Sequence, residues 1–157
     1  MAFSEAATLL ERAIGRGVMF TCAESCTGGM VAAALTDLPG SSAMFDRGFV
    51  TYTNAAKIDL LGVSPATLDQ FGAVSEDVAR EMAQGALARS MAQVAVSITG
   101  IAGPGGSEHK PEGRVCFGLA TRDGVTVETC DFGAVGRDLV RISARDHALS
   151  LLLRAVS

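Results

Sequence analysis

The 157-residue chain is long enough to form one domain with a sizeable core, since 48% of its residues are hydrophobic and 19% are charged. Its formal net charge of −4 argues against nucleic acid as a partner, because neutralising phosphates requires a basic surface. It has no run of about 20 apolar residues, the length of a membrane span. We therefore expect a single globular domain over residues 1–157 that binds neither nucleic acid nor membranes.

The N-terminal segment and the cysteines indicate a compartment. Residues 3–14 place acidic residues inside an apolar pattern, which favours a helix over a secretion signal. Without an export signal, reduced thiols are favoured over disulfides. We therefore expect a cytoplasmic protein whose cysteines are free, namely Cys22, Cys26, Cys116 and Cys130.

Hydrophobic periodicity and turn residues predict an alternation of helices and strands. In chain order, we expect a helix over 3–14, a strand over 18–23, a helix over 28–36, a strand over 45–53, helices over 54–61 and 65–71, a helix from residue 76, a strand over 94–99, a hairpin of strands 114–121 and 125–132, and a helix over 138–156. Asn54, Ser64 and Ser75 are the expected caps of the three middle helices.

Helices between strands, with a hairpin near the end, predict a three-layer α/β/α sandwich with a mixed central sheet. Ligands of such sheets bind beyond the carboxyl ends of the strands. The segment 21–29 and the loop 99–113 both leave such strand ends. We therefore expect them to form one crevice.

Several common catalytic motifs are absent. The chain has no G-x-G-x-x-G after its first strand, no Walker A loop and no G-x-S-x-G elbow. His109 lies in a Gly/Pro loop and His147 lies within a helix, so neither suits a Ser-His-Asp triad. Cys22 and Cys26 lack a second pair or a histidine cluster to complete a metal site. We therefore expect no catalytic metal.

The turn "ESCTGG" follows the first strand and contains the candidate nucleophile Ser25. Ser25 and Thr27 would lie beside the amides of Gly28 and Gly29 at the start of a helix, a place that suits a phosphate or an oxyanion. Alternatively, one of the two hydroxyls merely caps that helix. Cys26 is a rival nucleophile, but it has no evident partner base.

The segment "TYTNAAK" contains the only tyrosine, Tyr52, and one of two lysines, Lys57. A serine without a histidine needs another base, and a desolvated lysine can serve. Such a lysine must be neutral, so burial or nearby positive charge must lower its pKa. Alternatively, Lys57 is a surface lysine and Tyr52 lies at the edge of the core.

The segment "SITGIAGPGGSEHKPEGRV" follows a buried strand. Thr99 and Gly100 end that strand, and glycines such as Gly103 let backbone amides approach a ligand closely. Arg137, before the last helix, is either an anion clamp or a surface residue. The charged residues of the loop are expected to be solvated, namely Glu108, Lys110 and Glu112.

Five segments occur in an order that resembles one family: "AESCTGG", "RGFVTYTNAAK", "GAVSEDVAREMA", "SITGIAGPGG" and "KPEGRV". The chain is similar to the C-terminal domain of the competence/damage-inducible protein CinA, whose stand-alone members are nicotinamide-nucleotide amidohydrolases. The resemblance implies hydrolysis of the carboxamide of nicotinamide mononucleotide in pyridine nucleotide salvage. It also implies an α/β/α fold, a homo-oligomer, and no metal or organic cofactor.

The resemblance also implies roles for individual residues. Ser25 matches the nucleophile, Lys57 the base and Tyr52 a tyrosine that aligns them or relays a proton. The amides of Thr27–Gly29 or of Thr99–Gly100 would bind the oxyanion. The remaining substrate contacts are expected from Asn54, Gly103 and Arg137. Two alternatives stay open: a nucleotide-sensing module without turnover, and an amidase for a different carboxamide.

Overall fold

The computed structural model describes residues 2–107 and 109–157, and it omits the side chains of residues 2–4. Its elements are α1 (Ala2–Arg16), β1 (Phe20–Glu24), α2 (Met30–Leu35), a short 3₁₀ helix η1 (Ser41–Ala43), β2 (Phe45–Val50), α3 (Asn54–Leu61), α4 (Pro65–Phe71), α5 (Glu76–Ala88), β3 (Val94–Gly100), β4 (Arg114–Thr121), β5 (Gly124–Asp131) and α6 (Arg137–Ala155). The predicted order of helices and strands is confirmed.

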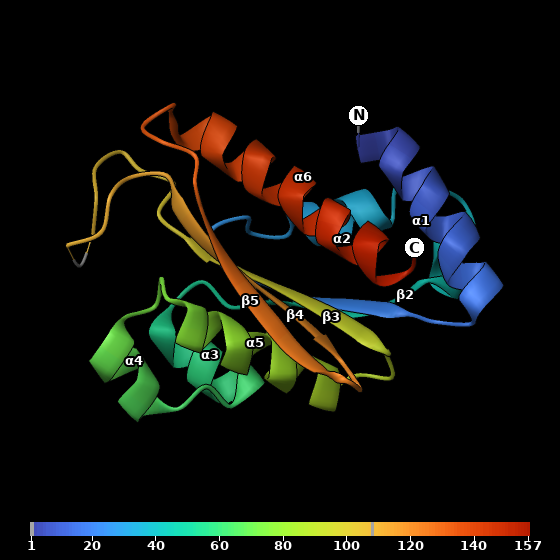
Figure 1. Ribbon diagram of the computed structural model, residues 1–157, viewed down its shortest axis with the longest axis horizontal. Coiled ribbons are helices and arrows are strands. Elements are labelled where there is room, and N and C mark those ends of the chain that lie inside the picture. The colour runs from blue at the N-terminus through green and yellow to red at the C-terminus, as the bar shows by residue number, and fades with distance from the viewer. Residues whose placement is uncertain (1, 108) are drawn as a thin grey trace.

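The strands form a five-stranded sheet in the order β2-β1-β3-β4-β5. Strand β1 is parallel to β2 and β3, whereas β4 is antiparallel to both β3 and β5. Helices α1, α2 and α6 cover one face of the sheet, and α3, α4 and α5 cover the other (Figure 1). The predicted three-layer sandwich with a mixed sheet is therefore confirmed.

Two apolar clusters hold the layers together. The larger one includes the fully buried Phe20 and Phe117 of the sheet and Leu149 of α6. The smaller one joins Ala23 of β1 to Met82 of α5 on the opposite face. Because β1 and β3 are covered on both faces, nearly all of their residues are buried, instead of alternating between buried and exposed.

The helix caps differ in part from the expectation. Thr53, not Asn54, caps α3: its hydroxyl accepts a hydrogen bond from the Ala56 amide at 3.1 Å. Asn54 is already the first helical residue, so its side chain is one position too late for that role. Ser75 caps α5 as predicted, whereas Ser64 precedes α4 without a side-chain cap.

The structure also tests the expectations about disulfides and membrane spans. All four cysteines are free thiols, as predicted. Within the described part of the chain, no helix is both long enough and apolar enough to cross a membrane.

Candidate active site

A cavity of about 320 Å³ opens beyond the carboxyl ends of β1 and β3. Its walls come from the turn after β1, the β2–α3 connection, the glycine-rich segment after β3 and the first residue of α6. Because β1 and β3 are parallel neighbours, the two segments that follow them meet at one edge of the sheet. The predicted crevice is therefore present.

The turn that contains Ser25 is organised by the buried carboxylate of Glu24, the last residue of β1. This carboxylate accepts hydrogen bonds from the amides of Gly29, Val31 and Ala32 at 3.0–3.2 Å. Amides at a helix N-terminus have no partner within the helix, and the helix dipole favours a negative charge there. Glu24 thus joins the end of β1 to the start of α2 and fixes the turn between them.

This arrangement corrects the expected use of Thr27, Gly28 and Gly29. The Gly29 amide binds Glu24, and the Gly28 amide donates to the Ser25 carbonyl at 3.1 Å. None of the three residues lines the cavity. The carboxylate of the protein's own chain fills the anion site that the sequence suggested for a substrate.

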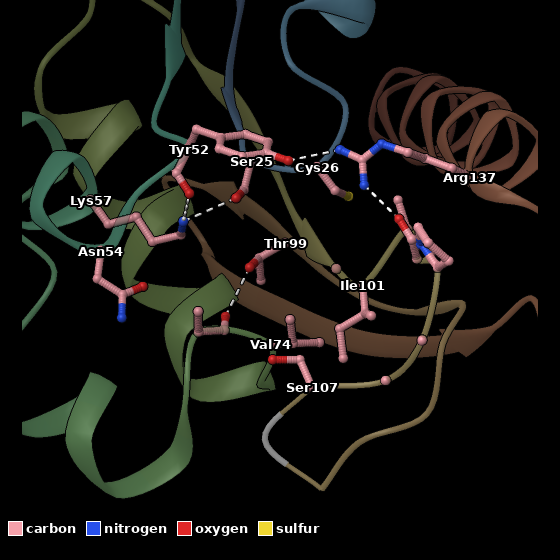
Figure 2. A pocket seen from close by; sticks show the side chains of 17 residues that line it. Ser25, Cys26, Tyr52, Asn54, Lys57, Val74, Thr99, Ile101, Ser107 and Arg137 are labelled. Carbon is pink, nitrogen blue, oxygen red and sulfur yellow. Dashed lines mark hydrogen bonds between the residues drawn. The ribbon is translucent and has the colours of Figure 1, made fainter.

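Lys57 lies beneath Ser25 and is only 1% exposed (Figure 2). Its Nζ atom is 3.0 Å from Ser25 Oγ, 2.9 Å from the Thr51 carbonyl and 3.2 Å from the Tyr52 carbonyl. Burial lowers the pKa of Lys57 to about 8. When neutral, the amine can donate to both carbonyls while its lone pair accepts the Ser25 hydroxyl proton.

Tyr52 approaches the pair through its main chain and not through its phenol. The phenol oxygen accepts a hydrogen bond from Arg137 Nη2 at 2.8 Å, and the side chain is 58% exposed. Arg137 Nη1 also donates to the Gly103 carbonyl at 2.7 Å. The structure therefore brings Tyr52 and Arg137 together at the rim of the cavity, with the tyrosine hydroxyl directed away from Lys57 (Figure 2).

Cys26 lines the cavity next to Ser25 but is poorly suited to act as a nucleophile. Burial raises the pKa of the Cys26 thiol to about 11, so the thiol is protonated at neutral pH. Its carbonyl accepts a hydrogen bond from Arg141 Nε at 3.0 Å, which holds α6 against the turn. Ser25 Oγ, in contrast, is 3.0 Å from the buried amine of Lys57.

The glycine-rich segment forms the opposite wall. Thr99, Gly100 and Gly103 all line the cavity, although the Thr99 hydroxyl already donates to the Ala73 carbonyl at 2.8 Å. Asn54, at the first turn of α3, faces the same space (Figure 2). The glycine-rich segment therefore offers mainly main-chain groups to a ligand, together with the side chain of Ser107.

The loop charges are not simply solvated, contrary to the expectation. Lys110 Nζ donates to the carbonyls of Phe71 and Val74, and Glu112 accepts a hydrogen bond from the Gly105 amide at 2.5 Å. These contacts fasten the loop to the α4–α5 connection and to itself. Glu108 lies outside the described residues.

Comparison with known proteins identifies the family. The model of the CinA C-terminal domain matches residues 3–156. The chain belongs to the CinA C-terminal domain family. It is 56% identical over 140 residues to the nicotinamide-nucleotide amidohydrolase PncC of Enterobacter agglomerans, covering 88% of this chain and 85% of that protein. The protein of the same name from Escherichia coli K12 is also 56% identical, with 87% and 84% covered.

A solved structure supports the same grouping of this CinA-family domain. The competence/damage inducible protein CihA of Agrobacterium tumefaciens superposes with a TM-score of 0.94 at 48% sequence identity. The match covers 99% of this chain and 94% of that one.

Three residues that organise this CinA-family site were not identified from the sequence. Glu24 was recognised as a neighbour of Ser25 but given no role, and Arg141 and Lys110 were not assigned to the site. An acid four residues before a predicted helix start was the available signal for Glu24. Arg141 and Lys110 bind carbonyl groups of distant segments, which no local pattern reveals.

Proposed function

We propose that this CinA-family domain is a nicotinamide-nucleotide amidohydrolase that converts nicotinamide mononucleotide to nicotinate mononucleotide and ammonia in pyridine nucleotide salvage. The 56% identity to proteins named for this activity supports the reaction. The observation that carries the mechanism is the 3.0 Å contact between Ser25 Oγ and Lys57 Nζ at a cavity wall. A serine beside a buried amine of lowered pKa is an activated nucleophile.

In the first half of the reaction, neutral Lys57 takes the proton of the Ser25 hydroxyl as Oγ attacks the carboxamide carbon. The C–N bond then breaks, and Lys57 returns the proton to the departing ammonia. The product is an ester between Ser25 and the nicotinoyl group. The carbonyls of Thr51 and Tyr52 hold the amine in line throughout, because both are bonded to Nζ in the resting state.

In the second half, water attacks the ester while Lys57 accepts its proton. Breakdown of the intermediate returns that proton to Ser25 Oγ and releases nicotinate mononucleotide. Each half of the reaction passes through a tetrahedral intermediate with a negatively charged oxygen. That oxygen requires N–H donors that have no other hydrogen-bond partner. Since the amides of Gly28 and Gly29 are engaged, we assign this role to the amides of Ala102 and Gly103, which line the cavity.

The ribose phosphate is placed at the rim, against Arg137. Its guanidinium now binds two neutral oxygens, those of Tyr52 and Gly103. Arginine binds phosphate through paired, charge-assisted hydrogen bonds that are stronger than those to neutral oxygens. Asn54, on the same wall as Lys57, is placed to contact the carboxamide or the pyridine ring.

Ammonia release from nicotinamide mononucleotide tests the proposal. We expect Ser25→Ala and Lys57→Arg each to lower kcat by about 10⁴-fold or more, because nucleophile and base act as one unit. Thermal unfolding and nucleotide binding by calorimetry provide the controls. A near-normal rate in either variant would contradict the dyad.

The same assay separates the alternatives. Nucleotide binding by the wild-type protein without ammonia release would identify a sensor module. Equal turnover of free nicotinamide and of the mononucleotide would identify an amidase that ignores the phosphate.

We further propose that residues 1–157 act as one domain and that the protein is a cytoplasmic homo-oligomer. The four free thiols are typical of a reducing compartment. Exposed apolar side chains near the site, including Val50, Leu139 and Ile142, are candidates for a subunit contact. Light scattering at several protein concentrations tests the oligomer.

A further inference from the structure

Three potential metal ligands converge on one face of the sheet, away from the cavity. Glu128 and Cys130 are two residues apart on β5, so their side chains point to the same side of the strand. His147 of α6 packs over that side. None of the three residues lines the cavity beside Ser25.

The ligand atoms are close together. His147 Nε2 is 3.4 Å from Glu128 Oε1 and 3.6 Å from Cys130 Sγ. The three ligand atoms all lie within 4.8 Å of one another. The imidazole ring also contacts the Phe117 ring, with centroids 4.5 Å apart, which restrains its orientation.

The two separations from His147 Nε2 are close to those of a tetrahedral zinc site. Zinc bonds are about 2.0–2.1 Å to nitrogen, about 2.0–2.2 Å to oxygen and about 2.3 Å to sulfur. At the tetrahedral angle, these bonds place the nitrogen ligand about 3.3 Å from the oxygen ligand and about 3.6 Å from the sulfur ligand. The distances of 3.4 and 3.6 Å from Nε2 agree with these values. A cation can therefore bind with little movement of Glu128 or Cys130 relative to His147.

We propose that Glu128, Cys130 and His147 bind one Zn²⁺ ion, with water as the fourth ligand. A mixed nitrogen, sulfur and oxygen set suits zinc, whereas calcium and magnesium prefer oxygen ligands alone. The side chains of His147 and Glu128 are 24% and 39% exposed, so the ion can enter from solvent.

One cation competes for this site. Arg154 Nη1 is 3.9 Å from Glu128 Oε1, but its side chain is 67% exposed and free to turn outward. The pair is long and exposed, so breaking it costs little.

A bound zinc ion would join two elements that cover the same part of the core. Strand β5 is the edge of the sheet, and α6 supplies Arg137 and Arg141 to the active site from its first two turns. The ion would fasten the middle of α6 to the edge strand. Because it binds the folded state, it would raise the temperature of unfolding.

Titration of the metal-free, reduced full-length protein with Co²⁺ tests the site, because four-coordinate Co²⁺ bound to a thiolate has characteristic visible and near-ultraviolet absorption bands. We expect one equivalent to produce these bands and Zn²⁺ to abolish them. Cys130→Ser should remove the thiolate band, and His147→Gln should weaken binding at least tenfold. His109→Asn, which changes the histidine of the exposed loop, should have no effect.

Thermal unfolding provides a second measurement that does not depend on spectroscopy or on enzyme activity. We expect excess Zn²⁺ to raise the unfolding temperature of the wild type and of His109→Asn, but not of Cys130→Ser. Equal Co²⁺ binding by the wild type and both ligand variants, or the absence of four-coordinate bands in the wild type, would overturn the proposal. None of these readouts uses the amidohydrolase reaction, so the two proposals fail separately.

Discussion

The two walls of the cavity are held in opposite ways. The turn after β1 is fixed by the fully buried carboxylate of Glu24, which accepts hydrogen bonds from the Gly29 amide and from two amides of α2. The loop after β3 is fixed by side chains near the surface: Lys110, Glu112 and Arg137. Water rarely replaces a partner in a buried hydrogen bond, whereas exposed hydrogen bonds open and re-form more easily. In the proposed reaction, the rigid wall therefore holds the nucleophile and the base, and the adjustable wall holds the oxyanion and the phosphate.

Removing the buried carboxylate of Glu24 should have the largest effect on stability and turnover, because it loosens the rigid wall. Glu24→Ala leaves three amides without acceptors, and each costs about 1–3 kcal/mol, so the free energy of unfolding should fall by about 3 kcal/mol or more. We expect kcat to fall with it, because the turn no longer presents Ser25 to Lys57. Urea unfolding and steady-state kinetics measure both effects.

Glu81 provides a matched control for Glu24. Its carboxylate also binds the start of a helix, through the Ser64 amide and the Thr67 hydroxyl at 2.8 and 2.6 Å, but away from the cavity. Glu81→Ala should lower the unfolding free energy while kcat stays within about twofold of the wild type. A stable, fully active Glu24→Ala would show that the turn holds without the carboxylate.

The pH dependence of turnover tests the base on the rigid wall. The pKa of Lys57 is about 8, and the protonated amine has no lone pair, so kcat/KM should fall about tenfold per pH unit below that value. At pH 6 we expect a rate about 100-fold below the plateau reached above pH 8. Initial rates of ammonia release from pH 5.5 to about 9.5 give the profile.

Tyr52→Phe is the control for this profile, because the phenol hydrogen-bonds Arg137 rather than Lys57. The acidic limb should keep its midpoint in this variant. A flat profile between pH 6 and about 8, or a midpoint that moves with Tyr52→Phe, would identify another base.

Variants of two arginines on neighbouring turns of α6 distinguish the roles of the two walls. Arg137 contacts the loop and Arg141 contacts the turn. Arg137→Met should raise KM for nicotinamide mononucleotide about 10- to 100-fold, the loss expected for charge-assisted bonds to phosphate, with little change in kcat. Arg141→Met should instead lower kcat.

The riboside of nicotinamide, which lacks the phosphate, completes the comparison of the arginines. Arg137→Met should leave its low turnover unchanged. An equal loss on both substrates would exclude a phosphate contact at Arg137.

The smallest effect is expected at the loop. Glu112 accepts the Gly105 amide at the surface, and Glu112→Gln keeps an acceptor there. We expect the unfolding free energy to change by less than about 0.5 kcal/mol and KM by less than about threefold. A large fall in kcat would mean that the loop also fixes the reacting atoms.

The sequence was informative where local chemistry was unusual. A serine in a Gly-rich turn, together with a scarce lysine, predicted two side chains that the fold places 3.0 Å apart. The shared crevice was also predicted, because the segments after β1 and β3 both leave the carboxyl ends of strands.

The sequence was less informative where a contact depends on how one side chain folds back or on long-range packing. The sequence alone does not show that the Glu24 side chain folds back toward α2. There its carboxylate accepts hydrogen bonds from the Gly29 amide, which was expected to bind substrate, and from the Val31 amide. Likewise, Cys130 and His147 meet only because α6 packs across the sheet. The phenol of Tyr52 was assigned to the base because the sequence does not distinguish main-chain from side-chain contacts.

The main-chain ladder between β1 and β2 has a consequence for how such domains can vary in length. The Thr51 amide donates to the Glu24 carbonyl at 2.8 Å, and the Thr51 carbonyl accepts from Lys57. Strand register thus sets the spacing between the proposed nucleophile and base, and a shift of one residue would turn Ser25 to the other face of the sheet. Insertions and deletions should therefore be tolerated between residues 104 and 112, beyond the proposed oxyanion donors, but not within the paired strands that precede Ser25 and Thr51.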